Sequence, residues 1–303
     1  MAKILSGTQI SKEVLSDLQQ EVTEIKETHP DFRPKLVIVQ VGGREDSNVY
    51  IRAKCKAAAE VGVETEHIRF PRTVAENELL RGVELLNADP RVHGIIVQLP
   101  LDCDNPIDAG KVTNAVSPLK DVDGIHTENA GRLAHGELEN FFIPCTPRGC
   151  LELILRTGMD LCGKHAVMIG RSKIVGAPMS ALLLSCNATV TVCHSKTERI
   201  DEICRQADLL VVACGCAHLV KKEWVRPGAV VIDCGINAIK DPSHPKGQRL
   251  VGDVDYANVK EVASWITPVP GGVGPMTVSM LIKNTVISAK RELLGTLRNN
   301  LQF

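Results

Sequence analysis

The sequence HAVMIGRSKIVGAPM at residues 165–179 predicts a buried strand that turns directly into a helix. Its apolar, largely branched run stops at Gly170, and helix-compatible sequence resumes at about Val175. A turn of this kind directs backbone N–H groups and the positive end of a helix dipole outward, where a phosphate binds readily. The stretch therefore indicates an α/β fold with a nucleotide-binding turn. An ordinary strand-to-helix turn is the alternative that this stretch alone leaves open.

The residues that follow indicate which dinucleotide would bind at the turn. Arg171 and Ser172 stand where the usual fingerprint has a second glycine that lets the backbone approach a pyrophosphate. The next predicted strand, 188–193, is followed by HSKT at 194–197 and not by the acidic residue that would bond a free ribose hydroxyl. A hydroxyl among cationic neighbours accepts a 2′-phosphate, which a carboxylate would repel. The sequence favours NADP over NAD, with Arg171 and Ser195 as the discriminating pair, unless the charges here are simply solvated.

Length and charge exclude several classes of protein. The 303 residues are enough for two domains with separate cores. The 35 basic and 36 acidic residues leave a formal charge of −1 without a block of one sign, which argues against a nucleic-acid partner. The first residues lack the pattern of a secretory signal or transit peptide, and no apolar run is long enough to span a bilayer. We therefore expect a cytoplasmic protein without a membrane partner.

Eleven cysteines raise the question of disulfides or a metal site. They are scattered, many lie within apolar runs, and no two form a C-x-x-C pair. This spacing predicts small core residues in a reducing compartment, and we expect no metal.

The order of predicted elements indicates two α/β domains. In the first half we expect a helix at 10–27, a strand at 35–41, a helix at 46–61, a strand at 65–70, a helix at 75–87 and a strand at 93–99. In the second half we expect a helix at 146–156, strands at 165–169, 188–193, 209–213 and 229–234, and a last helix at 277–297. This alternation predicts mainly parallel sheets covered on both faces, the second of the Rossmann type. We divide the chain into a first domain at 1–147 and a second at 148–277.

Three residues of the first half are candidates for catalysis. Tyr50 and Lys54 are four residues apart on a predicted helix, so they share one helix face, close to the sheet edge where open α/β folds bind ligands. An aromatic ring beside an amine suits an aromatic substrate; the alternative is an amphipathic helix with a surface lysine. Gln98 ends the third strand, either as a hydrogen-bonding group or as the first solvated residue. If Gln98 faces Lys54, it holds the amine without the counter-charge that would keep it protonated, so the lysine can act as a base.

Two loops complete the set of candidates. Asp123 lies in the sequence DVDG at 121–124, where it is either a turn carboxylate or a bidentate acceptor for the N–H groups of a pterin. The sequence TPVPGGVGPMT at 267–277 holds three prolines and three glycines. It predicts a rigid turn that lets backbone approach a ligand closely, or else a tight connection into the last helix.

Five motifs occur in chain order over nearly the whole sequence. They are Tyr-x-x-x-Lys at 50–54, Val-Gln-Leu-Pro at 97–100, Lys-Asp-Val-Asp-Gly at 120–124, Gly-Arg-Ser-x-x-Val-Gly-x-Pro at 170–178 and Pro-Gly-Gly-Val-Gly-Pro-Met-Thr at 270–277. Together they resemble the bifunctional methylenetetrahydrofolate dehydrogenase/cyclohydrolase family, with no departure at the motif positions. The resemblance implies NADP-linked oxidation of 5,10-methylenetetrahydrofolate to the methenyl form, then hydrolysis to 10-formyltetrahydrofolate in the same cleft, which the two domains flank.

The resemblance also implies a role for each candidate residue. Tyr50 would pack on the aminobenzoate ring, Lys54 would be the catalytic amine, Gln98 would assist it and Asp123 would hold the pterin. The folate would be lined by Val97 and Leu99 and by Pro270, Gly271, Gly272, Val273 and Gly274. NADP would be held by Gly170, Arg171, Ser172, Ser195 and Ile236.

The family further implies a homodimer, a last helix at 278–303 that returns to the first domain, and tetrahydrofolate substrates with or without polyglutamate tails. In animals this unit often precedes a formyltetrahydrofolate synthetase domain, so the chain is either complete or the front of a longer protein. Two other functions are open: a shikimate-dehydrogenase-like NADP oxidoreductase, and a dinucleotide-binding protein without catalytic activity.

Overall fold

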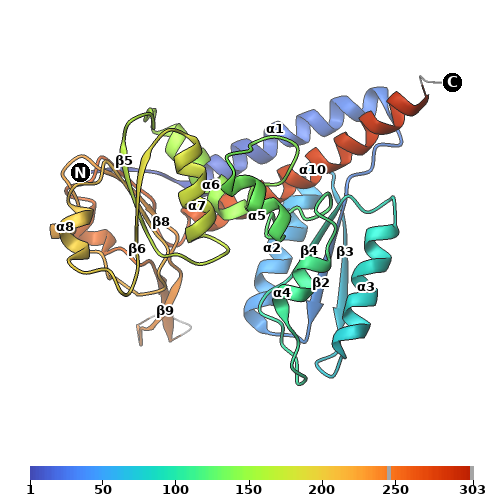
Figure 1. The fold of residues 1–303 in the computed structure, drawn as a ribbon, viewed down its shortest axis with the longest axis horizontal. Helices are drawn as coiled ribbons and strands as arrows, with labels where there is room; N and C mark the ends of the chain where they lie inside the picture. The colour runs from blue at the N-terminus through green and yellow to red at the C-terminus, as the bar shows by residue number, and fades with distance from the viewer. Residues whose placement is uncertain (244–246, 301–303) are drawn as a thin grey trace. The chain divides into compact units, whose positions relative to one another are not determined.

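The chain divides into two compact units in the computed structural model, which describes residues 1–243 and 247–300, with side chains as far as residue 295. Unit 1 is formed by Met1–Ser11, Leu133–Glu137 and Thr146–Thr277. Unit 2 is formed by Lys12–Arg132, Leu138–Cys145 and the residues from Val278 onward. Each unit contains its own parallel sheet (Figure 1).

The sheet of unit 2 has three parallel strands in the order β3-β2-β4. Their bounds are Lys35–Val41 for β2, Glu64–Phe70 for β3 and Gly94–Val97 for β4. The last six residues of β2 are all buried, as expected for a central strand covered on both faces, whereas edge strand β3 is polar and mostly exposed. An apolar cluster that includes Val39, Val97 and Leu79 forms the core on one side of this sheet.

Two helix ends of unit 2 are capped by residues that the sequence provides. Three helices of this unit are α2 (Glu45–Val61), α3 (Glu76–Ala88) and α4 (Ala109–Ala115). Gly62 ends α2 in the left-handed conformation, with φ of 83°, and its N–H bonds the carbonyl groups of Ala58 and Ala59. Asp108 begins α4 by accepting hydrogen bonds from two backbone N–H groups of the first turn.

Four helices carry the chain from one unit into the other. They are α1 (Gly7–Thr28), α5 (Thr127–Ala134), α6 (Cys145–Arg156) and α10 (Val273–Asn300). Apolar residues that recur at helical spacing on α1, such as Val14, Leu18 and Val22, are buried. None of the helices within the described ranges has the length and apolar character that a membrane span requires.

Unit 1 contains a six-stranded parallel sheet in the order β1-β11-β8-β7-β5-β6. The strands are β1 (Lys3–Ile4), β5 (His165–Ile169), β6 (Thr189–Cys193), β7 (Leu209–Val212), β8 (Val230–Asp233) and β11 (Trp265–Ile266). From β5 the chain moves to β6 on one side, then returns to β7 on the other side. The direction of winding therefore reverses at β5 and β7, and such a switch point at the carboxyl edge is where doubly wound sheets bind ligands.

The remaining elements of unit 1 are short. They are α7 (Gly176–Ser185), α8 (Ile200–Cys204), the 3₁₀ helix η1 (Lys222–Trp224), β9 (Asn237–Lys240), β10 (Gln248–Val251) and α9 (Tyr256–Val259). β9 and β10 pair with each other as an antiparallel hairpin, separate from the large sheet.

The predicted α/β class with parallel sheets is confirmed, and β2 and β5 have the predicted bounds. Residues 1–11 and 133–137 differ from the predicted division, since both segments lie in unit 1. The first of them contains β1, which pairs in parallel with β11. The sequence did not predict β1, β9, β10 or β11, which are too short or too exposed to show periodicity. The interpretation of all cysteines as core residues was wrong for Cys162 and Cys216, which are exposed, and five others are only partly buried.

Gly170 provides a test of the turn that follows β5. Its φ is 118°, and an added Cβ would overlap the carbonyl oxygen of Ala213. We expect Gly170→Ala to lower the free energy of unfolding of unit 1 by more than about 3 kcal/mol, because strain and overpacking add. The control Gly163→Ala has a positive φ of 71° with open space around it and should cost only about 1 kcal/mol.

Both tryptophans, Trp224 and Trp265, lie in unit 1, so tryptophan fluorescence during urea unfolding reports on this unit. Equal midpoints for the two variants would contradict the close approach of β5 and β7 at Gly170.

Candidate active site

Lys54 and Gln98 form a hydrogen-bonded pair in unit 2. Lys54 lies on α2 and Gln98 directly follows β4. The Nζ of Lys54 donates to the Oε1 of Gln98 at 3.0 Å. The Nε2 of Gln98 donates to the carbonyl of Leu99 at 2.9 Å, and its backbone N–H donates to the carbonyl of Val39 at 2.8 Å. The amide is therefore oriented by its own backbone, with its oxygen directed at the amine.

The surroundings of the Lys54 amine suit a proton-transfer site. Gln98 is 9% exposed and Lys54 is half-buried, so the amine is partly removed from water. Its hydrogen-bond partner is a neutral amide and not a carboxylate. A lysine in these surroundings can take and return a proton at a bound substrate.

Tyr50 lies one helical turn before Lys54 on α2 and is 42% exposed. Residues four apart on a helix share one face, so the ring and the amine point to the same side. An exposed aromatic ring on that side offers a flat apolar surface to a planar ligand. Of the other residues predicted to line the folate, Val97 is buried in the apolar core and Leu99 is half-buried.

Cys145 interacts with Asp123 and lies within electrostatic reach of Lys54. The sequence analysis predicted it only as a core residue. Its backbone N–H donates to the carbonyl of Asp123 at 3.2 Å, and its Sγ donates to the carbonyl of Val122 at 3.2 Å. Burial raises the pKa of the Cys145 thiol well above its usual value; Asp123 raises it further, whereas Lys54 acts in the opposite direction. Asp123 and Lys54 are thus both within electrostatic reach of one buried thiol.

The loop that carries Asp123 is held on two sides. The Nδ2 of Asn284, on α10, donates to the carbonyl of Val122 at 2.9 Å. Asp121 is 2% exposed and accepts hydrogen bonds from the backbone of His126 and the side chain of Asn129, both at 2.8 Å. Burial raises the pKa of this carboxyl group. Asp121 therefore performs the structural role in the loop, whereas Asp123 is only half-buried.

The dinucleotide candidates lie in unit 1, at the carboxyl ends of β5 and β6. The Oγ of Ser172 accepts hydrogen bonds from the backbone N–H groups of Val175 at 3.1 Å and Gly176 at 3.3 Å, at the start of α7. Arg171 and Ser195 are exposed, and neither side chain bonds to any residue in the described part of the chain. Gly176 packs so closely on Gly170 that a Cβ there would overlap the Gly170 carbonyl.

This arrangement fits a phosphorylated dinucleotide. A strand end, a tight turn and the positive end of a helix dipole lie at one edge, and an exposed guanidinium and an exposed hydroxyl stand beside them. Ile236 follows β8 at the same sheet edge and is 48% exposed. The geometry is therefore consistent with the predicted NADP contacts.

The glycine and proline loop also lies in unit 1, against the start of α1. The carbonyl of Gly271 accepts hydrogen bonds from the backbone N–H of Thr8 at 2.9 Å and its Oγ1 at 3.3 Å. Gly271 has a φ of 100°, and Gly272 is buried where a Cβ would approach Pro268. These contacts explain the glycines at 271 and 272, while Pro270 is exposed and Gly274 has open space around it.

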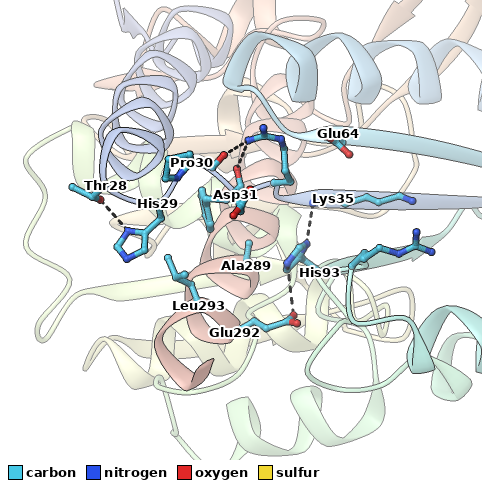
Figure 2. A pocket seen from close by; sticks show the side chains of 13 residues that line it. Thr28, His29, Pro30, Asp31, Lys35, Glu64, His93, Ala289, Glu292 and Leu293 are labelled. Atoms are coloured by element: carbon cyan, nitrogen blue, oxygen red, sulfur yellow. Dashed lines mark hydrogen bonds and ion pairs between the residues drawn. The ribbon is translucent and has the colours of Figure 1, made fainter. Parts of the chain in front are cut away.

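Unit 2 contains a pocket, which Figure 2 shows from close by. Lys35 and Glu64 begin β2 and β3, and His93 precedes β4, so the pocket is at the amino edge of the sheet, opposite Gln98. The Nδ1 of His93 accepts from the backbone N–H of Lys35 at 3.1 Å, and its Nε2 lies 3.7 Å from Glu292. Burial lowers the pKa of His93. The His93 ring is therefore hydrogen-bonded to the backbone at the sheet edge. None of the predicted site residues lines the pocket.

Two family models match the chain. The model described as "Tetrahydrofolate dehydrogenase/cyclohydrolase, catalytic domain" matches residues 5–123, and the one described as "Tetrahydrofolate dehydrogenase/cyclohydrolase, NAD(P)-binding domain" matches residues 144–293. The chain is 50% identical to bifunctional protein FolD 2 of Arabidopsis thaliana over 96% of both chains.

The chain belongs to the tetrahydrofolate dehydrogenase/cyclohydrolase family.

Two further comparisons bear on this family membership. The chain is 61% identical to the cytoplasmic C-1-tetrahydrofolate synthase of Drosophila melanogaster over 96% of this chain, but it spans only 30% of that relative. A solved Trypanosoma brucei methylenetetrahydrofolate dehydrogenase-cyclohydrolase, complexed with NADP cofactor and inhibitor, matches with a TM-score of 0.91 and 40% identity, over 96% of this chain and 98% of that one. The resemblance inferred from the five motifs is confirmed.

Proposed function

We propose that this chain oxidises 5,10-methylenetetrahydrofolate with NADP and hydrolyses the methenyl product to 10-formyltetrahydrofolate. The bond between Lys54 and Gln98 is the observation that carries the proposal, because it gives the amine a neutral hydrogen-bond partner. Family membership supports the same two activities, and the cofactor in the Trypanosoma brucei structure supports NADP. A shikimate-dehydrogenase-like oxidoreductase is not favoured by any observation of the site.

The proposed contacts to the folate are made by side chains of unit 2. Tyr50 is exposed beside Lys54 and is proposed to stack on the aminobenzoate ring. Asp123 is proposed to accept hydrogen bonds from the amino and ring N–H groups of the pterin, a bidentate contact that a free carboxylate makes well. The assignment of Val97, Leu99 and Pro270–Gly274 to the folate rests on the family resemblance and stays a prediction.

Lys54 is proposed to move the protons of the hydrolytic step. Hydride removal from the methylene carbon leaves a cation shared by two nitrogens and moves no proton on the substrate, so it requires alignment rather than a base. Addition of water to the methenyl carbon and opening of the ring do require proton transfers. Gln98 holds the Lys54 amine in one position through both transfers without fixing its charge.

NADP, when bound, accepts the hydride that leaves the substrate. The residues proposed to hold it are Gly170, Arg171, Ser172, Ser195 and Ile236. The exposed Arg171 and Ser195 would receive the 2′-phosphate, and the positive end of the α7 dipole would face the pyrophosphate.

Several properties of the whole protein are also proposals. The chain spans about 30% of the length of the Drosophila melanogaster and Homo sapiens C-1-tetrahydrofolate synthases, so a formyltetrahydrofolate synthetase domain following it in a longer protein is a proposal. The names of those relatives support a cytoplasmic location. A homodimer and polyglutamylated substrates rest on the family resemblance alone.

Replacing Lys54 separates the two activities. We expect Lys54→Met to lower the rate of methenyltetrahydrofolate hydrolysis by about 10²- to 10⁴-fold, because general acid–base catalysis contributes that much. Dehydrogenase activity should remain measurable, since hydride removal needs no proton transfer. Both rates can be followed by methenyl absorbance. Lys56→Met, on the same helix at an exposed position, is the control and should retain both activities. Equal loss of both activities in a folded Lys54→Met variant that still binds folate would refute this division.

Replacing Arg171 tests the cofactor assignment. Arg171→Ala should raise the KM for NADP by about 10- to 100-fold and leave the KM for NAD nearly unchanged, since a charge-assisted hydrogen bond contributes about 1.5–3 kcal/mol. Lys164→Ala removes an exposed cation just before β5, at the opposite edge, and should change neither constant. The assignment is wrong if the two cofactors respond alike to Arg171→Ala.

A further inference from the structure

Asp253 is a fully buried carboxylate to which neither the sequence motifs nor the proposed function gives a role. Its side chain is 0% exposed. Its Oδ2 accepts hydrogen bonds from the backbone N–H groups of Cys214 at 2.7 Å and Gly215 at 2.9 Å. Its Oδ1 accepts from the Nδ2 of Asn237 at 2.8 Å. One carboxylate therefore holds the loop after β7 and the first residue of β9.

A second buried carboxylate, Asp233 at the end of β8, holds Asp253 in place. The Oδ1 of Asp233 accepts from the backbone N–H groups of Gly235 at 2.9 Å and Asp253 at 3.0 Å, and its Oδ2 accepts from Val254 at 2.9 Å. Burial raises the pKa of Asp233 to about 6, against the effect of these three hydrogen bonds. A Cβ at Gly235 would overlap Asp253, so the backbone after β8 packs directly on this pair.

These loops lie on one particular side of the proposed dinucleotide site. β7 and β8 follow β5 on one side in the sheet, and β6 lies on the other side. Ser195, the proposed partner of the 2′-phosphate, follows β6 and so marks the adenosine side. The carbonyl of Ala213, at the start of the loop after β7, lies directly against Gly170. A dinucleotide that crosses the turn at Gly170 must therefore extend its other half over the loops after β7 and β8.

We propose that Asp253 is a positioning residue for the nicotinamide half of NADP: it fixes the loops at 213–216 and 234–237 in the shape that receives this half. The inference rests on the proposed function, because it requires the dinucleotide. Asp253 does not reach the cofactor itself, since both of its oxygens are engaged and it is buried. Gly215 is exposed, with a φ of 69° and open space around it, so the loop that Asp253 holds presents bare backbone at the sheet edge.

Asp253→Asn is the most informative substitution because it preserves size. An amide has one acceptor oxygen, so either the pair of N–H groups at 214–215 or the amide of Asn237 faces a donor instead of an acceptor. The two loops then lose their common anchor, whereas Arg171 and Ser195 are left as they are. The adenosine side should keep its affinity while the nicotinamide side loses it.

The test measures binding by isothermal titration calorimetry with two ligands on the full chain. Adenosine 2′,5′-bisphosphate occupies only the adenosine side, whereas NADP⁺ occupies both sides. For Asp253→Asn we expect the Kd of NADP⁺ to rise about tenfold or more, as for loss of a buried charged hydrogen bond, and the Kd of the bisphosphate to stay within about twofold. Asp208→Asn is the control: this carboxylate bonds the backbone N–H of His165 and the side chain of Arg226, at the amino edge of the same sheet, and should change neither Kd.

A milder substitution keeps the proposal testable if the Asp253→Asn variant does not fold. Asn237→Ala removes one donor and leaves the carboxylate, and it should raise the Kd of NADP⁺ by about threefold with the bisphosphate again unchanged. The proposal is overturned if NADP⁺ binding is unchanged in both variants, or if both ligands weaken together. A wild-type chain that binds both ligands but does not oxidise methylenetetrahydrofolate would refute the proposed function and not this assignment.

Discussion

The hydrogen bond between the Lys54 amine and the Gln98 amide is the interaction on which the proposed chemistry depends. It exists because Gln98 follows a strand whose register is fixed: Val97 pairs with Val39, and the N–H of Gln98 continues that ladder to the Val39 carbonyl. A slip of one residue would turn the Gln98 side chain to the other face of the sheet, away from α2. The buried residues of β2 therefore determine, through the strand register, where the Lys54 amine meets its partner.

The two units present different chemical groups at the carboxyl edges of their sheets, and these groups suit different parts of the proposed reaction. In unit 2 the site contains an amine, an amide, a ring and a carboxylate, which suits proton transfer and recognition of a pterin. In unit 1 the carboxyl edge presents the positive end of a helix dipole, a guanidinium and a hydroxyl, which suit phosphates. Both edges follow the rule that parallel sheets bind ligands where their strands end. In unit 1 the buried carboxylates Asp233 and Asp253 also hold the loops after β7 and β8 in place.

Much of this could be predicted from the sequence, and the failures have physical reasons. β5 and its turn are local: the apolar run and the glycine that ends it lie together in the sequence, so both were predicted. β1 is two residues long, and its partner β11 lies more than 250 residues further along the chain, so no local pattern reports the pairing. Tyr50 and Lys54 share a helix and were found by spacing. Cys145 and Asp253 matter through backbone groups brought near them only by folding, which no spacing in the sequence reveals.

The central claim is that a neutral partner at position 98 allows Lys54 to transfer protons. The most direct test is to replace Gln98 with a charged residue of similar size. The pH dependence of methenyltetrahydrofolate hydrolysis should be measured for the wild-type chain and for Gln98→Glu, with the spontaneous rate subtracted at each pH. The new carboxylate would hold the proton on the Lys54 amine, so we expect hydrolysis at neutral pH to fall by about 10²-fold, the lower limit for lost general acid–base catalysis, and to recover in part as the pH rises. Hydrolysis by Gln98→Glu at the wild-type rate with an unchanged pH profile would contradict the account.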